Sequence, residues 1–584
     1  MPGISRPRRA IAIAIALGTL AACRHAPAPS TTPAPRVATP NFPSTWRFHA
    51  GRRATIAPHA MIASNSRLAS EAGVEILKAG GNAVDAAVAT GFALAVTYPR
   101  AGNIGGGGFM VIRMADGRVA ALDYREMAPL AATRDMYVDA NGKLTDKGVV
   151  GPLASGVPGA VAGMAEALRR YGTMPLSRVL QPAIRLASKG FVVDDALEAS
   201  IRADSELISK FEGAKVFLPG GKPLAAGTKL VQPALARTLE LIAEQGPKAF
   251  YQGEVADSIA AEMRRDGGII TKADLAAYRP MWREPIRGSY RGDSVFAMPP
   301  SSSGGITTIE SLNILETFPT LPPFGSAARA HLVAEAFRRA FIDRNTELGD
   351  PAFVHMPVDT LTSKAYARTL ALTIRPDRAT PSPSFTSARH EATHTTHYSV
   401  VDAKGNAVAT TTTINSLYGS GVYVRGAGFF LNNEMDDFAS QPGTANQFGL
   451  VQGEANAIAP GKRMLSAMSP TIVVGADGKL LLVVGAAGGP TIITSTTQVI
   501  LNVVDDHMSL ADAMSAPRLH EQTWPDELYY ERGGLSSSAA DSLRAMGYEL
   551  KERGSIANAN AVMWTGSGWA GMVEPRSYGG AVGY

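Results

Sequence analysis

A threonine-rich segment contains the residue types from which a hydroxyl nucleophile can be built. Residues 393–415, THTTHYSVVDAKGNAVATTTTIN, form two alternating runs joined by a short polar turn. If the turn is centred on Lys404, Thr395 faces Thr413, with Cβ atoms about 5 Å apart, so that the two hydroxyls could hydrogen-bond. Asn415 would point to the same face. A strand rich in threonine for β-propensity alone explains the same pattern, and these residues taken alone favour that simpler interpretation.

An overlapping pattern offers a different chemistry. Residues 390–394, HEATH, are a literal H-E-x-x-H zinc-protease motif with His397 nearby. On a helix, the motif would place two imidazoles one turn apart, with Glu391 as the base. Pro381 and Pro383 lie just upstream, however, and the threonines around His394 favour a strand. A zinc protease is therefore a remote alternative.

The segments that would position these residues mix helices and strands. Residues 60–100 read as two apolar helices separated at Ala79-Gly80-Gly81-Asn82, and a hairpin follows with its turn at Asp116-Gly117. Residues 150–375 are mostly helical in pattern, and segments such as ARAHLVAEAFRRAFIDR end in basic residues, as helix C-termini do. Residues 375–394 are polar and Pro/Ser-rich, which predicts an exposed, mobile loop.

After that loop the chain becomes strand-like, with the segments THYSVVD, AVATTTTIN, TIVV, KLLLVV and AVMWT. The uncharged stretch from Leu480 to Val504 is broken by Gly488-Gly489-Pro490, so it predicts a buried strand, a glycine turn and a helix rather than a membrane span. Helices early and hairpins late predict an α+β fold in which helices cover a sandwich of sheets.

The N-terminus and the composition indicate where the protein acts and which class of protein it is. Residues 1–23 combine three arginines, an apolar stretch and the single cysteine, Cys23, after Leu20-Ala21-Ala22, as in a bacterial lipoprotein signal. Residues 24–48 read as a Pro-rich tether. Of the 584 residues, 45% are hydrophobic and 18% charged, typical of a globular protein. Part of the net charge of +5 belongs to the leader, and no basic run predicts a nucleic-acid partner.

Several longer motifs together carry a resemblance to a known family. The run TTHYSVVDAKGNAVATTTTIN, followed by LNNEMDDF at 431–438 and LSAMSPT at 465–471, is similar to the gamma-glutamyltranspeptidases. The segments AGNIGGGGFMVIR, DYREMAP, ITKADLAAY, MPPSSSGG and LGDP match that family in the same order. The resemblance covers the chain from about residue 50 to its end.

The resemblance implies an N-terminal-nucleophile (Ntn) hydrolase, an αββα four-layer sandwich formed jointly by two autoproteolytic chains. The precursor would cut itself between His394 and Thr395, giving a large subunit of residues 49–394 and a small subunit of residues 395–584 that remain together as a heterodimer. Cleavage would free an α-amine whose unperturbed pKa is about 7.7 to 8, which supplies the base that a hydroxyl nucleophile needs. Thr413 would orient the nucleophile.

The family pattern also assigns binding roles by residue. Arg125 matches the ligand of the substrate α-carboxylate, and Asn415, Glu434 and Asp437 match the groups that hold the α-ammonium. The N–H groups of Gly488 and Gly489 would stabilise the oxyanion.

Two positions depart from the family pattern. Ser466 is followed by Ala467 where the family often has a second serine, so one hydroxyl contact to the glutamyl group is missing. Phe448 stands in the lid-like segment 442–449 where some relatives have tyrosine.

The function implied is a self-processing γ-glutamyltransferase and glutathione hydrolase that passes a glutamyl group to water or to an amino acid or peptide. No metal or organic cofactor is expected. The leader predicts an exported, periplasmic protein attached to the outer membrane only through a lipid on Cys23. Ala467 keeps open a related Ntn acylase, acting on cephalosporin, glutaryl or poly-γ-glutamate substrates. An unprocessed lipoprotein that binds peptides without chemistry is a further alternative.

Overall fold

The computed structural model describes residues 39–48, 51–382 and 395–584. These residues belong to one compact unit. The predicted signal with Cys23, most of the tether, the H-E-x-x-H motif and the predicted cleavage residue His394 lie outside the described residues. Within the described part of the chain, no helix is both long and apolar enough to cross a membrane.

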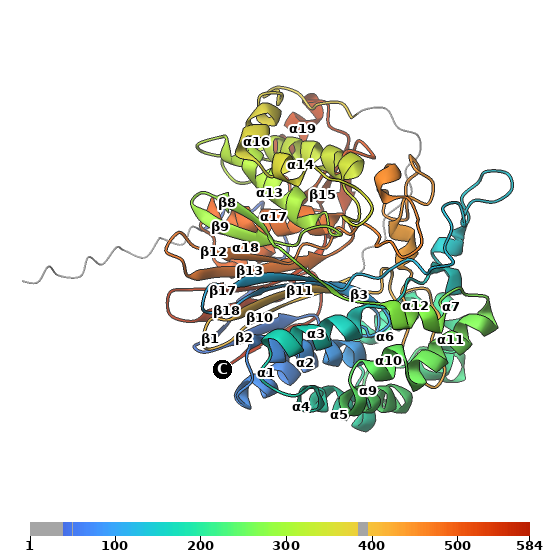
Figure 1. Ribbon diagram of the computed structural model, residues 1–584. Helices are drawn as coiled ribbons and strands as arrows, with labels where there is room; N and C mark the ends of the chain where they lie inside the picture. The colour runs from blue at the N-terminus through green and yellow to red at the C-terminus, as the bar shows by residue number, and fades with distance from the viewer. Residues whose placement is uncertain (1–38, 49–50, 383–394) are drawn as a thin grey trace, which may run out of the picture. The chain divides into compact units, whose positions relative to one another are not determined.

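Two antiparallel sheets are stacked at the centre, and helices cover both outer faces (Figure 1). The first sheet has the strand order β1 (Thr55–Ala57), β18 (Trp569–Met572), β17 (Asn558–Trp564), β13 (Leu480–Ala487), β12 (Thr471–Val474), β9 (Asp293–Ala297), β8 (Ile286–Tyr290). The second has the order β19 (Gly580–Gly583), β2 (Met61–Ser64), β10 (Thr396–Val401), β11 (Ala407–Thr413), β3 (Gly107–Arg113), β4 (Val119–Asp123), β7 (Met281–Arg283). The predicted α+β, αββα architecture is confirmed.

One helical layer packs on the second sheet. It contains α1 (Arg67–Lys78), α2 (Ala83–Thr97), α3 (Ala160–Tyr171), α4 (Leu176–Val179), α5 (Gln181–Lys189), α6 (Asp195–Ala203), α7 (Ser205–Ser209), α8 (Ala214–Phe217), α9 (Pro233–Gln245), α10 (Lys248–Tyr251), α11 (Glu254–Asp266) and α12 (Lys272–Ala277). The predicted break between the first two helices is correct, and Asn82 begins α2 with a capping box that it forms with Asp85. Every residue of α2 is buried, as expected for a helix that is apolar on all sides.

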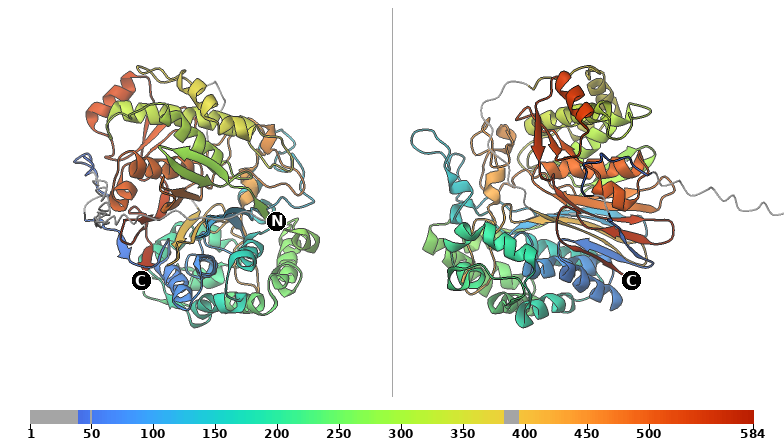
Figure 2. Two further views of the ribbon diagram at one scale, coloured as in Figure 1. Left: turned by 60° about the vertical axis from the view of Figure 1, so that its left-hand side comes forward. Right: turned by 180° about the vertical axis from the view of Figure 1, so that it is seen from behind.

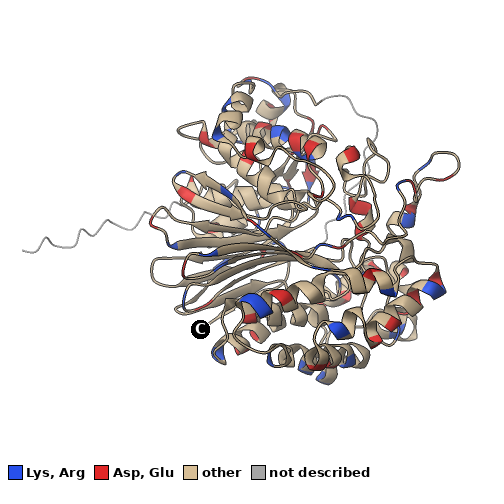
Figure 3. Ribbon diagram, in the orientation of Figure 1, with Lys and Arg blue, Asp and Glu red and all other residues tan. Residues whose placement is uncertain are grey.

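The other helical layer packs on the first sheet (Figure 2). It contains α13 (Gly304–Glu316), α14 (Ala327–Glu347), α15 (Val358–Leu361), α16 (Lys364–Ala371), α17 (Thr491–Val504), α18 (Leu510–Ser515) and α19 (Ser537–Ala545). A small sheet of β14 (Leu519–His520), β15 (Leu528–Glu531) and β16 (Leu550–Arg553) lies beside it. Charged residues concentrate on the helices and loops, whereas the strands of the two central sheets carry few (Figure 3).

Both central sheets interleave strands from the two sides of residue 395. Segment 51–382 contributes β1, β2, β3, β4, β7, β8 and β9, and segment 395–584 contributes the other seven strands. In the second sheet, β10 pairs with β2, and β11 pairs with β3. Separating the two segments would therefore break both sheets and expose their shared core.

The register of the hairpin β10–β11 agrees with the one expected from the turn. Thr396 pairs with Thr412, and Val401 pairs with Ala407, which places the turn centre at Lys404. Asp402 fixes the turn, because its Oδ1 accepts the backbone N–H groups of Lys404 at 2.9 Å and Asn406 at 3.0 Å. The strand, glycine turn and helix predicted for residues 480–504 are present as β13, Gly488-Gly489 and α17.

The expectation of a mostly helical segment between residues 150 and 375 omitted several strands. β7, β8 and β9 lie between residues 281 and 297, and the two-stranded sheet of β5 (Phe191–Val192) and β6 (Lys229–Leu230) lies farther upstream. β7 and β8 are edge strands that are partly exposed, so their sequences contain arginine, glycine and serine instead of an apolar run. Pairing with distant strands, rather than local propensity, makes them strands.

Candidate active site

The two threonines selected from the sequence meet at the open end of the β10–β11 hairpin. Thr395 directly precedes β10, Thr413 ends β11, and the Oγ1 of Thr395 donates a hydrogen bond to the Oγ1 of Thr413 at 3.3 Å. The backbone N–H of Asn415 donates to the same Thr413 oxygen at 2.8 Å. Thr395 is 8% exposed, and its φ of 155° is one that a β-branched residue rarely adopts.

A network of asparagines fixes the start of β10 next to Thr395. The Thr396 hydroxyl donates to Asn65 Oδ1 at 3.0 Å, and Asn560 Nδ2 donates both to that oxygen and to the His397 carbonyl. These bonds connect β10 to the neighbouring sheet through β17. The position of Thr395 is thus determined by contacts with both sheets.

A pocket at this end of the sandwich brings together most of the predicted site residues. Its lining is Arg125, Arg344, Thr395, Thr413, Asn415, Glu434, Asp437, Phe448, Leu450, Leu465, Ser466, Ala467, Met468, Gly489, Pro490 and Ile492. Gly488 lies next to this lining. The structure therefore gathers predicted residues that lie far apart in the sequence, and only His394 and Cys23 lie outside the described residues.

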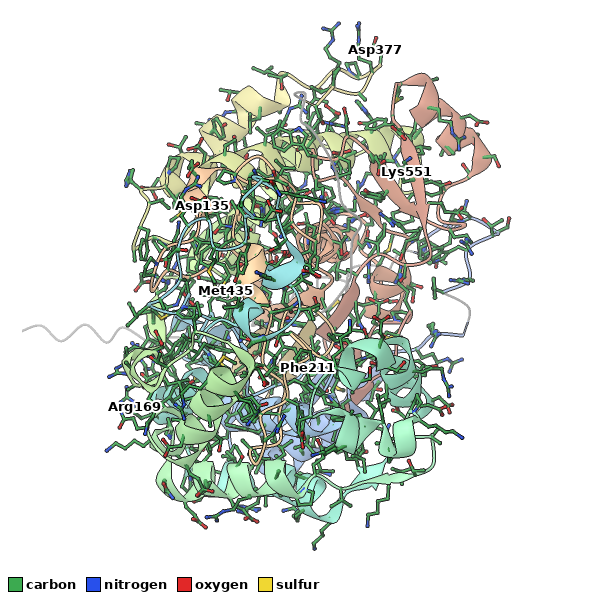
Figure 4. All side chains as sticks on the ribbon, turned by 90° about the vertical axis from the view of Figure 1, so that its right-hand side faces the viewer. Asp135, Arg169, Phe211, Asp377, Met435 and Lys551 are labelled. Atoms are coloured by element: carbon green, nitrogen blue, oxygen red, sulfur yellow. The ribbon has the colours of Figure 1, made fainter. Side chains whose placement is uncertain are left out.

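Arg125, Glu434 and Asp437 form a largely buried ion-pair cluster in the pocket. Arg125 follows β4, and its guanidinium donates to Glu434 and to Asp437, both from the 3-10 turn η4 (Glu434–Asp437). Met435, from the same turn, lies near the centre of the face shown in Figure 4. Burial alone would lower the pKa of Arg125, but the two carboxylates outweigh it and raise that pKa. Arg125 is therefore held in its charged form.

Glu434 keeps one oxygen without a partner. Its Oε2 is buried and accepts no hydrogen bond within the described part of the chain. Burial raises the pKa of Glu434 well above its ordinary value, because Arg125 offsets only part of the lost solvation. A cationic donor such as an ammonium group would satisfy this oxygen and favour the ionised carboxylate.

A third carboxyl group, not anticipated from the sequence, stands beside Arg125. Glu126 is fully buried, and its Oε2 lies 3.7 Å from Arg125 Nη1. Neither of its carboxylate oxygens accepts a hydrogen bond from a described residue. Burial raises the pKa of Glu126 to about 7, with Arg125 opposing the rise. Its only sequence signal was its position directly after Arg125.

The paired glycines lie between β13 and α17. Gly488 has a φ of 139° and Gly489 a φ of 57°, backbone conformations that favour glycine. Among the described residues, neither of their N–H groups has a hydrogen-bond partner. Both precede the N-terminus of α17, whose dipole favours negative charge there. The pair thus has the geometry of an anion-binding turn.

The segment 442–449 contributes Phe448 to the pocket wall. Phe448 lines the pocket and is 3% exposed, and a methyl group on Gly489 would lie 2.9 Å from its ring. Asn446 holds the segment in place, because its Oδ1 accepts the Phe448 N–H at 3.0 Å and its Nδ2 donates to the Asp436 carbonyl. The aromatic ring therefore packs directly on the glycine turn.

The pocket also contains a second arginine that the sequence did not single out. Arg344 lies in the last turn of α14, where a basic residue was attributed to the helix C-terminus. Instead its side chain is buried and lines the pocket beside Asp437. The family-like segments LGDP and MPPSSSGG lie close to Arg344, but a helical sequence pattern cannot show which basic side chain enters a cavity.

His397, noted beside the zinc-protease motif, lies in the core between the two sheets. Its Nδ1 bonds with Thr411 at 2.9 Å and its Nε2 with Ser399 at 3.0 Å, so both ring nitrogens are engaged. Burial lowers the pKa of His397 to about 3, and the ring is neutral at ordinary pH. Among the described residues, no group of three or more His, Cys, Asp or Glu could hold a metal ion.

Known proteins are similar to this one over most of the chain. The Glutathione hydrolase proenzyme of Escherichia coli (strain K12) is 49% identical over 529 residues, which are 89% of this chain and 91% of the relative. A cephalosporin acylase structure from Bacillus halodurans aligns with a TM-score of 0.82 at 29% identity, covering 93% of this chain and 99% of that one.

The gamma-glutamyltranspeptidase structure from Helicobacter pylori aligns with a TM-score of 0.53 at 47% identity, covering 54% of this chain and 91% of that one. Residues 69–584 match the profile of the family described as Gamma-glutamyltranspeptidase. The chain belongs to the gamma-glutamyltranspeptidase family.

Proposed function

We propose that the protein is a self-processing γ-glutamyltransferase and glutathione hydrolase. The observation that carries this proposal is the meeting of Thr395, the Thr413 hydroxyl and the charged groups of Arg125, Glu434 and Asp437 in one pocket. The 49% identity to a glutathione hydrolase proenzyme supports the same activity. A zwitterionic amino-acid head carries one charge of each sign, and the pocket offers both.

Self-processing would convert Thr395 into a nucleophile with its own base. The Thr395 hydroxyl attacks the carbonyl carbon of His394, the peptide bond breaks, and the acyl group moves from nitrogen to oxygen as an ester. Water hydrolyses this ester, which leaves a carboxylate on His394 and a free α-amine and hydroxyl on Thr395. The unusual φ of Thr395 supports this step, because cleavage releases backbone strain at the bond that breaks.

The catalytic cycle would repeat this chemistry on a substrate. The Thr395 hydroxyl attacks the γ-carbonyl, its proton passes to the α-amine, and the N–H groups of Gly488 and Gly489 stabilise the oxyanion. The protonated amine then gives its proton to the departing amino group. A glutamyl ester remains on Thr395, and water or the amine of an acceptor amino acid or peptide releases it.

Each binding residue has a proposed role that follows from its charge and position. Arg125 would donate hydrogen bonds to the α-carboxylate, while Glu434, Asp437 and Asn415 would hold the α-ammonium. Ser466 and Ala467 line the side of the pocket formed by residues 465–468. Thr413 accepts the hydrogen bond of Thr395 and would orient its hydroxyl.

We further propose that the mature protein is a heterodimer of the large and small subunits in the periplasm, held at the outer membrane by a lipid on Cys23 through the tether of residues 24–48. The interleaving of the two segments in both sheets supports their staying together after cleavage. The localisation rests on the leader alone.

An Ntn acylase is the second candidate, and two observations favour it. Ala467 leaves the pocket without one hydroxyl, and the structural match to a cephalosporin acylase spans most of the chain. Glu434 argues for a glutamyl substrate, because a glutaryl group has no ammonium to donate to its buried and unpartnered Oε2.

The experiment that tests the proposed function supplies glutathione with and without glycylglycine and follows the products by mass spectrometry. Release of glutamate alone, and of γ-glutamyl-glycylglycine when the acceptor is present, is the expected result. Cleavage of a glutaryl anilide at a higher kcat/KM than a γ-glutamyl anilide would instead assign the acylase activity.

A further inference from the structure

Arg344 is a buried cation that lines the pocket without a charged partner. Its Nε donates to Ser303 Oγ at 3.1 Å, and its Nη1 donates to Asn345 Oδ1 at 2.8 Å and to Gln452 Oε1 at 3.3 Å. All three acceptors are neutral. The remaining nitrogen, Nη2, is buried and has no hydrogen-bond partner among the described residues.

The two arginines of the pocket therefore differ in how their charges are compensated. Arg125 contacts Glu434 and Asp437 directly and has Glu126 at 3.7 Å. Arg344 forms no ion pair with any described residue, and burial lowers its pKa to about 10, with Asp437 opposing the fall. Arg344 is still protonated at neutral pH. An anion entering this pocket thus meets a positive charge at Arg344 that no direct ion pair with a described residue neutralises.

The unpartnered atoms of the pocket define the chemistry of a ligand. Glu434 Oε2 lacks a donor, and Arg344 Nη2 lacks an acceptor. A buried polar group without a partner is costly, and a charge more so, hence a ligand that supplies both partners gains affinity at both atoms. An ammonium is the donor that Glu434 Oε2 lacks, and a carboxylate is the acceptor that Arg344 Nη2 lacks.

We propose that Arg344 binds the α-carboxylate of the γ-glutamyl donor together with Arg125, and that it makes the site select donors that carry this carboxylate. The inference rests on the proposed function and adds to it a specificity-determining residue. Arg344 Nη2 would donate to one oxygen of the α-carboxylate, and Arg125, which also contacts Glu434 and Asp437, would donate to the other. Because Arg344 is not paired with a carboxylate of any described residue, we expect it to contribute more than Arg125 to the selectivity for donors with an α-carboxylate.

A purely structural role for Arg344 predicts something different. Ser303 accepts from Arg344 Nε and donates to the Ser466 carbonyl at 2.6 Å, so Arg344 also supports the segment that carries Ser466. If this support were its only contribution, removing Arg344 would weaken every ligand of the pocket alike. Binding of the carboxylate would instead affect only ligands that have one.

The test compares two neutral-amide analogues that each keep one charge. Glutaramate keeps the carboxylate without the ammonium, and 4-aminobutyramide keeps the ammonium without the carboxylate. Their inhibition constants are measured against hydrolysis of a γ-glutamyl anilide by the processed enzyme. In Arg344→Gln, the constant of glutaramate should rise about 10- to 100-fold, the size of one charge-assisted hydrogen bond, while that of 4-aminobutyramide should stay within about twofold.

Ser303→Ala is the matched control, because it removes the Nε contact and keeps the charge of Arg344. It should change both inhibition constants by the same factor. Equal changes in Arg344→Gln, or no change in either constant, would overturn the inference. Self-cleavage and thermal melting report whether each variant folds. If Arg344→Gln does not fold, Arg344→Lys replaces it, with an expected rise of about fivefold for glutaramate only.

The wild-type protein separates this inference from the proposed function. A wild type that does not cleave the γ-glutamyl anilide contradicts the proposed function itself. A wild type that cleaves it, combined with equal effects of Arg344→Gln on both analogues, contradicts only the role of Arg344.

Discussion

The hydroxyl of Thr395 donates to the hydroxyl of Thr413 across the open end of one β-hairpin, at 3.3 Å. The same Thr413 oxygen accepts the backbone N–H of Asn415, which holds it in place. Because the hairpin register determines this contact, the orientation of the Thr395 hydroxyl follows from the pairing of β10 with β11.

Replacing Thr413 by valine should therefore impair both reactions of Thr395. Thr413→Val keeps the shape of the side chain and removes the acceptor, so we expect self-cleavage and kcat to fall about 10- to 100-fold. Thr413→Ser should retain most of both. Gel electrophoresis of the precursor over time and steady-state rates measure the two effects. Thr410→Val, on the opposite face of the same strand, is the control, and a Thr413→Val protein as fast as the wild type would refute the role.

The raised pKa of Glu126 should make the stability of the folded protein depend on pH. Its folded-state pKa of about 7 lies above the ordinary value of 4.5. Between these values the unfolded chain has lost the proton that the folded protein keeps, so stability falls as the pH rises through this interval. The loss amounts to about 1–3 kcal/mol above pH 7. Glu126→Gln should raise the melting temperature at pH 8 more than at pH 5.

The control for this prediction is Glu206→Gln, since Glu206 has an 88% exposed side chain. It should shift the melting temperature equally at the two pH values. An equal shift at pH 5 and pH 8 in Glu126→Gln as well would show that Glu126 does not exchange its proton in this interval.

A side chain at position 489 is expected to collide with Phe448. A methyl group at position 489 would lie 2.9 Å from the Phe448 ring, and the φ of 57° adds strain. Gly489→Ala should lower kcat about tenfold, because overpacking of 1–3 kcal/mol displaces the glycine turn. The double variant Gly489→Ala/Phe448→Ala should recover part of this loss. Purely additive effects in the double-mutant cycle would contradict a direct contact.

The leader predicts a lipid on Cys23. Mass analysis of the N-terminal peptide of the exported protein should show a diacylglyceryl-modified cysteine at position 23, and Cys23→Ser should release the protein from the membrane fraction. A wild-type protein found in the soluble periplasmic fraction with an unmodified N-terminus would contradict the anchor and would leave the catalytic proposal untouched.

Local patterns predicted much of the architecture. The turn at Lys404 determined the hairpin register, and the glycines at positions 488 and 489 correctly divided a strand from a helix. These features depend on neighbouring residues, whose backbone preferences can be read from the chain. β7 and β8 were not anticipated because partly exposed edge strands gain their structure from distant partners.

The site itself could be predicted only in part. Motif matches identified residues of both charges, and the pocket brings them together. They could not show that Arg125 is already paired with two carboxylates, or that Arg344 enters the pocket from α14. Both facts depend on contacts between residues about 100 to 300 positions apart, and no local pattern encodes them.

N-terminal sequencing of the smaller chain of the purified, active protein tests the central claim most directly. The proposal predicts that this chain begins at Thr395, and that Thr395→Ala yields one uncut and inactive polypeptide. A fully active preparation with an unbroken bond between His394 and Thr395, or a smaller chain that begins at any other residue, would contradict it.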